Sequence, residues 1–378
     1  MKIESFFYIP DKGWSVNPFP ALDSEDTLVL AFGAPEFMDT PDPILALAKA
    51  YPRSCVVGCS TAGEILGTQL YDKSLVVSVV KFEHSHLILA SAPSHSPQDS
   101  FNAGRSLASQ LKKPDLRSVL VFSEGSHVNG SELVNGFNLP ANVTITGGLA
   151  GDGDRFQRTW VIYAGRPQTE MVVAVGLCGD NLAIGYGSRS GWSASNVEWR
   201  VTKSQDNVLY ELNGKPALQL YKEYLGEKAS ALPAVALRFP LALRADAADD
   251  HPVIRTILTV DEAAKSMVFA GDIPQGYLAE IMTANLDQLI TSASEATAMS
   301  HVQNQADTLC IAVSCVGRRL VLGERTKEEL EAAIKALPPH TAQIGFYSYG
   351  EISPSGGYCD LHNQTMTVTT IQETAIAN

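Results

Sequence analysis

Short apolar runs rich in Val, Ile and Leu recur along the whole chain and constrain its fold more than any other feature. Runs of this length, bounded by Gly or Pro, are typical of strands that are buried on one or both faces. Clear examples are residues 28–32, 75–80, 119–122, 171–175 and 309–313. Helical periodicity is found at 96–111, 215–225, 277–300 and 325–337. These patterns predict an α/β (α+β) chain in which two strand-rich segments form mixed sheets flanked by helices.

Length and charge narrow the class of protein. The 378 residues, of which 45% are hydrophobic, are enough for two or three domains with substantial cores. Lys and Arg number 28 and Asp and Glu 41, which gives a net charge of −13. A broad nucleic-acid surface is therefore not expected, because such surfaces depend on clustered Lys and Arg.

The sequence also carries signals about location. No apolar run approaches the roughly 18–20 residues of a membrane-spanning helix, so we expect no membrane insertion. The first residues, MKIESFFYIPDKGW, lack the apolar stretch and small-residue cleavage site of a secretory signal. Six scattered cysteines without a C-x-x-C motif fit a reducing compartment. Together these features predict a cytoplasmic protein.

A small-residue turn at 58–64, GCSTAGE, follows an apolar strand. Such a turn allows backbone amides to face a ligand, and the alternative is a tight turn that needs the φ freedom of glycine. The spacing matches neither G-x-S-x-G nor a Walker A loop. Cys59 or Ser60 would be the nucleophile if the chain were a hydrolase, although no His partner lies nearby in the sequence.

A second glycine-dense segment, TGGLAGDGD at 146–154, lacks the order of a dinucleotide-binding motif. Gly147 and Gly148 are expected to permit close backbone approach, either to another strand or to a small ligand. Arg189 lies among small residues in GYGSRSGW and has a planar fork suited to a ligand carboxylate. The alternative for Arg189 is an exposed or internally paired side chain.

The segment GFYSYGEISP at 345–354 is the most distinctive. If it is extended, Tyr347, Tyr349 and Glu351 share one strand face. His362 and Asn363 follow in LHNQTM. We expect these side chains to line one pocket together with the glycines and the arginine named above, and an edge-strand explanation is the alternative. The predicted ligand-binding residues are Gly147, Gly148, Arg189, Tyr347, Tyr349, Glu351, His362 and Asn363.

His84 and His86 alternate along a predicted strand. Two histidines without a third ligand nearby make a poor zinc signature. We therefore expect them to mark a solvated strand end.

Five segments together resemble the FIST domain, a two-part sensory module. They are 58–65, 146–152, 201–226, 314–323 (SCVGRRLVLG) and 345–366. The resemblance runs from about residue 25 to 373. It implies an N-terminal extension at 1–24, a FIST N segment at 25–218, a FIST C segment at 219–373 and a tail at 374–378.

The resemblance implies an intracellular signal-transduction sensor that binds a small ligand and is not an enzyme. Amino acids or related metabolites are the ligands proposed for the family. Bacterial members of this length also resemble haem-binding nitric-oxide sensors, which regulate a separate histidine kinase or cyclic-di-GMP enzyme. That branch implies non-covalent haem b, with His362 as the candidate axial ligand. A haem-free metabolite sensor, the hydrolase above and a structural adaptor remain alternative functions. For any of these functions, association into a homo-oligomer is left open.

Overall fold

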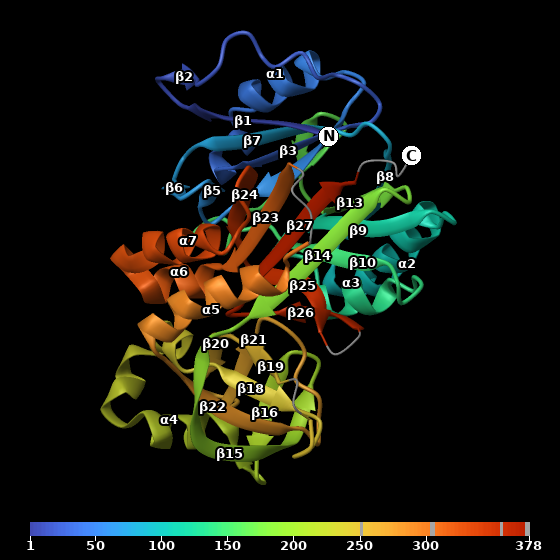
Figure 1. The fold of residues 1–378 in the computed structure, drawn as a ribbon. Coiled ribbons are helices and arrows are strands. Elements are labelled where there is room, and N and C mark those ends of the chain that lie inside the picture. The colour runs from blue at the N-terminus through green and yellow to red at the C-terminus, as the bar shows by residue number, and fades with distance from the viewer. Residues whose placement is uncertain (250–251, 303–306, 356–357, 375–378) are drawn as a thin grey trace.

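The computed structural model describes residues 1–249, 252–302, 307–355 and 358–374. Figure 1 shows a strand-rich body, with helices at its top and on its left and right, above a smaller strand-rich unit. The predicted α/β (α+β) class is confirmed. No helix within the described ranges is both long enough and apolar enough to cross a membrane.

Three sheets form the body. The first has the order β12 (Arg166–Gln168), β11 (Val161–Tyr163), β4 (Cys55–Ser60), β3 (Thr27–Gly33), β7 (Leu75–Lys81), β1 (Lys2–Ile9) and β2 (Gly13–Trp14). The second has the order β26 (Tyr358–His362), β25 (Gly350–Ser355), β10 (Thr144–Leu149), β9 (Leu116–Ser123), β13 (Met171–Cys178) and β8 (His86–Pro93). The third has the order β14 (Leu182–Arg189), β27 (Met366–Glu373), β23 (Thr308–Cys315), β24 (Thr341–Ser348), β5 (Glu64–Leu66) and β6 (Gln69–Tyr71).

The smaller unit, which we call the insert, comprises residues 192–284. Its strands have the order β19 (Val253–Arg255), β18 (Leu241–Arg244), β22 (Leu278–Ala284), β15 (Trp192–Gln205), β16 (Val208–Leu212), β21 (Ser266–Phe269) and β20 (Ile257–Asp261), with β17 (Lys215–Pro216) beside β16. The α-helices among the described residues are α1 (Asp42–Ala50), α2 (Ser100–Leu111), α3 (Gly130–Gly136), α4 (Ala217–Leu225), α5 (Leu286–Met299), α6 (Val316–Leu322) and α7 (Thr326–Lys335). Of these, only α4 belongs to the insert, which therefore has its own core of strands packed against α4.

The three sheets of the body are built alike. Each contains a parallel strand pair, β3–β4, β9–β10 or β23–β24, whose strands are joined through one or two helices. An antiparallel strand that comes later in the chain, β7, β13 or β27, lies beside the first strand of the pair. A strand from earlier in the chain, β1, β8 or β14, pairs with the other side of this antiparallel strand. The body therefore consists of three structural repeats, and the third is interrupted by the insert.

The repeats exchange hairpins. The hairpin β5–β6 of the first repeat pairs with β24 of the third. The hairpin β11–β12 of the second repeat pairs with β4 of the first, and β25–β26 of the third pairs with β10 of the second. Each sheet is therefore completed by strands from another repeat.

The centre of the body lies where the three sheets meet. Phe32, Phe122 and Phe346 come from β3, β9 and β24 and are fully buried. The ring centroid of Phe32 lies 5.5 Å from that of Phe122 and 4.6 Å from that of Phe346. Burial of each such side chain contributes about 1.5–3 kcal/mol, so this cluster holds the sheets together.

A glycine occupies one equivalent position in each parallel pair. Gly58, Gly147 and Gly345 lie opposite Ala31, Val121 and Ala312 on the neighbouring strand. A Cβ atom at these glycines would lie 1.8, 1.9 and 1.8 Å from the facing carbonyl oxygen. The three glycines therefore allow close contact between strands, which is one of the two roles that the sequence left open for Gly147.

One predicted element differs from the structure. The helix predicted over 277–300 is split, because residues 278–284 form β22 and only Leu286–Met299 is helical. Asn285 separates them, since its side chain accepts hydrogen bonds from the Asp287 and Gln288 amides and caps α5. The predicted division at 218/219 falls inside the insert, and the predicted extension at 1–24 contains β1 and β2 of the first sheet.

Candidate functional site

The structure separates the aromatic and acidic residues of the 345–354 segment. The chain turns between β24 and β25, so strand alternation does not continue through Tyr349. The Tyr347 hydroxyl donates to Glu329 (2.6 Å), whereas the Tyr349 hydroxyl donates to Asp152. Glu351 accepts from the Ser348 hydroxyl (2.5 Å). The three side chains therefore have three different hydrogen-bond partners.

Glu351 has a counterpart in another repeat. Its carboxylate binds the Ser348 hydroxyl and the Thr365 amide, while that of Glu64 binds the Thr61 hydroxyl and the Ser74 amide and hydroxyl. Burial raises the pKa of both carboxyl groups to about 8. Each glutamate lies at the start of an exchanged hairpin, so the role of Glu351 here is to fix that hairpin.

His362 and Asn363 are also engaged within the fold. The His362 Nε2 atom lies 3.1 Å from the Ser353 carbonyl oxygen, and burial lowers the pKa of the imidazole. The Asn363 amide donates to the neighbouring His362 carbonyl, and its Oδ1 atom has no hydrogen-bond partner within the part of the chain that the structure describes. Neither residue lines any of the five cavities described for this chain.

Of the other candidates, one lies beside Glu351, which itself is paired with His362 across β25–β26. Gly148 in β10 faces Glu351 across the β10–β25 pair. Arg189 is half-exposed and lies 3.7 Å from Glu295. Cys59 and Ser60 are fully buried, burial raises the pKa of the Cys59 thiol, and the Ser60 hydroxyl accepts from the Trp160 amide. None of the five described cavities is lined by more than one of the predicted residues, and the two hydrolase candidates are closed off from solvent.

Two of the predicted residues line described cavities. Arg189 lines a cavity of about 510 Å³ beside α5, and Tyr349 lines a separate one. This cavity of about 520 Å³ lies between the second sheet and the insert, and we call it the interface cavity. On the body side it is lined by the segment after β9, by α3 and by Leu149 at the end of β10. On the insert side it is lined by the β15–β16 turn and by residues 269–272 after β21. Carboxyl ends of parallel strands and boundaries between structural units are frequent ligand-binding places.

The lining of the interface cavity is acidic and aromatic. Glu132, Asp206 and Asp272 supply carboxylates, and none of the described lining residues is Lys, Arg or His. Phe156 is 46% exposed and stacks on Tyr349, with ring centroids 4.5 Å apart. The cavity therefore offers negative charge beside an accessible aromatic face.

Two sets of part-buried hydrogen bonds position this lining. Asp152 accepts hydrogen bonds from the amides of Phe156, Gln157 and Arg158, which fixes the turn that presents Phe156. Asn129 caps α3 and donates from Nδ2 to Asp272 Oδ1 (2.9 Å), which joins the body to the insert. Sequence reasoning missed these residues because the segments that meet here are far apart along the chain.

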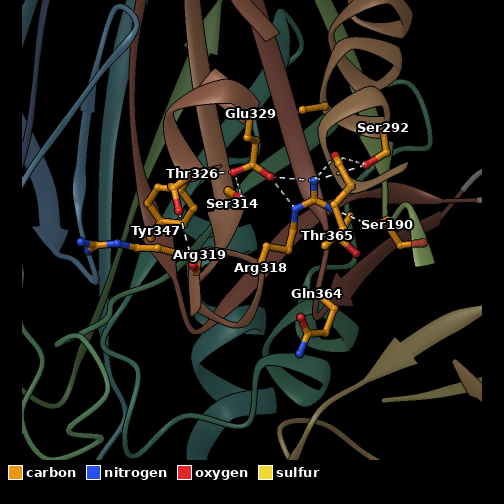
Figure 2. Close-up of polar contacts among 12 residues, drawn as sticks. Ser190, Ser292, Ser314, Arg318, Arg319, Thr326, Glu329, Tyr347, Gln364 and Thr365 are labelled. Carbon is orange, nitrogen blue, oxygen red and sulfur yellow. Dashed lines mark hydrogen bonds and ion pairs between the residues drawn. The ribbon is translucent and has the colours of Figure 1, made fainter. Parts of the chain in front are cut away.

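A buried ion pair connects the insert to the body at both of its ends. Figure 2 shows Glu329 lying between Tyr347 and Arg318. The Arg318 guanidinium donates to Glu329 (2.8 Å), to the Leu289 carbonyl (2.7 Å) and to the Ser190 carbonyl. Ser190 precedes the first strand of the insert and Leu289 follows its last, so one side chain in α6 holds both crossing segments.

Comparison of the sequence with known proteins finds two matching domain families and one similar protein. Residues 27–215 match the FIST N domain and residues 217–354 match the FIST C domain. The chain is 24% identical over 324 residues to the uncharacterized protein MJ1623 of Methanocaldococcus jannaschii. That alignment covers 79% of this chain and 60% of the relative, so the chain spans about 60% of the curated relative's length.

Proposed function

Because this chain belongs to the FIST family, whose domains are associated with small-ligand sensing in signal transduction, we propose that it is a sensor whose ligand binds in the interface cavity. The observation that carries this proposal is the cavity itself. Its volume of about 520 Å³ lies within the usual range of roughly 300–1,000 Å³ for small-molecule sites.

The ligand that best suits this lining is a small amine with an apolar portion, such as a basic amino acid or a polyamine. Glu132, Asp206 and Asp272 attract a positive charge, and the exposed face of Phe156 suits an ammonium group through a cation–π contact. The Arg255 side chain donates to the Asp272 carbonyl from the insert side and offsets part of this negative charge. The carboxylates of Glu132 and Asp206 still favour binding of a cation over an anion in this cavity.

Signal output follows from the position of the cavity. A ligand that touches α3 and the β15–β16 turn together favours one placement of the insert relative to the body, since only that placement provides both sets of contacts. A separate histidine kinase or cyclic-di-GMP enzyme is the partner that would respond to this change. The Arg318 contacts at both ends of the insert support such coupling.

We expect L-arginine, L-lysine or putrescine to raise the melting temperature of the protein, and succinate to leave it unchanged. Asp206→Asn should weaken amine binding about fivefold by calorimetry, because it removes one surface-exposed charge interaction worth about 1 kcal/mol. Asp180→Asn, an exposed aspartate paired with Arg117, is the matched control and should bind like the unaltered protein. Preference for succinate, or equal weakening by both variants, would overturn the amine proposal.

Haem with nitric oxide is a second proposal for the ligand, and the residues present fit it less well. An axial ligand must face a slot wide enough for the haem ring, whereas His362 is buried and lines none of the five described cavities. The interface cavity has no His among its described lining residues. His362 as axial ligand is therefore not supported by these contacts.

We accordingly expect protein purified from haem-supplemented cells to show no Soret band. The absorption spectrum with and without nitric oxide is the measurement. A Soret band that moves on addition of nitric oxide and disappears in His362→Ala, but not in His340→Ala, would establish the haem proposal instead.

A further inference from the structure

Three potential metal ligands meet at one end of the second sheet. The ligand atoms of His86, Asp115 and Cys178 all lie within 4.8 Å of one another. His86 Nε2 lies 3.6 Å from Asp115 Oδ2. From the sequence His86 was expected to mark a solvated strand end for want of further ligands, and the fold supplies two of them from other strands.

The sheet itself places these donors. His86 is the first residue of β8, and Cys178, the last residue of β13, is its direct cross-strand partner. Directly opposed residues on antiparallel strands have Cβ atoms about 4.5–5.5 Å apart. Asp115 immediately precedes β9, whose first residue Leu116 pairs with Cys178. Two adjacent strands and the residue before a third therefore each contribute one donor, and strands position ligands more rigidly than loops do.

We propose that His86, Asp115 and Cys178 bind one Zn²⁺ ion, with a fourth coordination position open to water. Thiolate, imidazole and carboxylate are the ligands that zinc prefers, and the two negative charges neutralise the ion. This site is separate from the interface cavity, because it lies at the start of β9 whereas the cavity lies beyond the end of that strand.

The distances suit zinc after a small adjustment. Tetrahedral zinc with ordinary bond lengths holds its ligand atoms about 3.3–3.6 Å apart. Cys178 is buried and fixed, whereas the side chains of His86 and Asp115 are 51% and 41% exposed and can rotate toward it. Ca²⁺ and Mg²⁺ prefer all-oxygen ligands and do not match this set.

Binding requires loss of the thiol proton. Burial, and to a lesser degree the charge of Asp115, raise the pKa of Cys178 to about 11, while Lys113 acts in the opposite direction. The metal-free thiol is therefore protonated at neutral pH, and each bound ion releases one proton to solvent.

The test is titration of the full chain with Cd²⁺, a zinc substitute whose thiolate charge-transfer absorption reports directly on a cysteine ligand. We expect one equivalent to bind, and expect His86→Ala and Asp115→Asn to weaken binding at least tenfold. Both residues are exposed, so neither change threatens the fold. Cys178→Ser should abolish the absorption band.

Two controls separate this site from adventitious binding. His84→Ala removes an exposed histidine two residues from His86, and Cys55→Ser removes another of the six free cysteines. Both variants should bind Cd²⁺ like the unaltered chain. Equal losses in His84→Ala and His86→Ala, unchanged binding in Asp115→Asn, or an absorption band that persists in Cys178→Ser would each overturn the proposal. None of these results bears on ligand binding in the interface cavity.

Discussion

Replacement of Arg318 by Met is expected to lower the free energy of unfolding by about 3–5 kcal/mol, because it leaves the Glu329 carboxylate buried without its cation. Both side chains are fully buried, with Arg318 Nη2 2.7 Å from Glu329 Oε1. The same change removes the hydrogen bonds to the Ser190 and Leu289 carbonyls. Urea unfolding followed by circular dichroism measures the loss.

A second readout distinguishes this role from simple packing. Since Arg318 holds both segments that lead into the insert, limited proteolysis of Arg318→Met should cut near residues 190 and 285 faster than in the unaltered protein. Arg325→Met removes a solvent-exposed guanidinium paired with Asp287 and Glu328, and should change stability much less. Similar losses in the two variants would show that burial of the Arg318–Glu329 pair is not what matters.

Gly345→Ala should be at least as damaging, with a loss above about 4 kcal/mol and little soluble protein. Its Cβ would lie 1.8 Å from the Ala312 carbonyl oxygen, and a backbone atom cannot move away as a side chain can. Relief would require β23 and β24 to separate next to Phe346 in the central cluster. The soluble fraction after expression and urea unfolding measure the effect.

Gly67→Ala provides the matched comparison. A Cβ at Gly67 would have nothing within 4 Å, and only its φ of +59° opposes the change. The expected cost is therefore about 1–2 kcal/mol, the usual penalty for an L-residue in the left-handed region. If Gly345→Ala were no less stable than Gly67→Ala, the close approach of the strands could not be the reason for glycine.

Local sequence signals were sufficient for most secondary structure. The helices predicted over 96–111, 215–225 and 325–337 are confirmed as α2, α4 and α7, since their apolar spacing and flanking Pro residues are local properties. The single helix predicted over 277–300 was wrong, because the Ala-rich helical pattern continues back across Asn285 into the residues that form β22. The threefold repetition left little trace in the sequence, because the repeats share strand order and a few positions such as Gly58, Gly147 and Gly345.

The site was less accessible to sequence reasoning. Strand alternation predicted a common face for Tyr347, Tyr349 and Glu351, but the turn between β24 and β25 sends each to a different partner. The interface cavity joins Glu132 of the second repeat to Asp206 of the insert, and no local pattern indicates that such distant segments meet. The same holds for His86 and Cys178, which only strand pairing brings together.

The exchange of hairpins has a consequence for synthesis of the chain on the ribosome. The turn of the first hairpin is held at Gly67 by Gln343, which lies 276 residues further along. At about 5–20 residues per second, that partner emerges roughly 14–55 s after the hairpin has been made. During this interval the hairpin edge is open to other nascent chains, and edge-to-edge pairing between molecules is its main alternative. Slower initiation, which spaces ribosomes along the message, should therefore increase the yield of native protein.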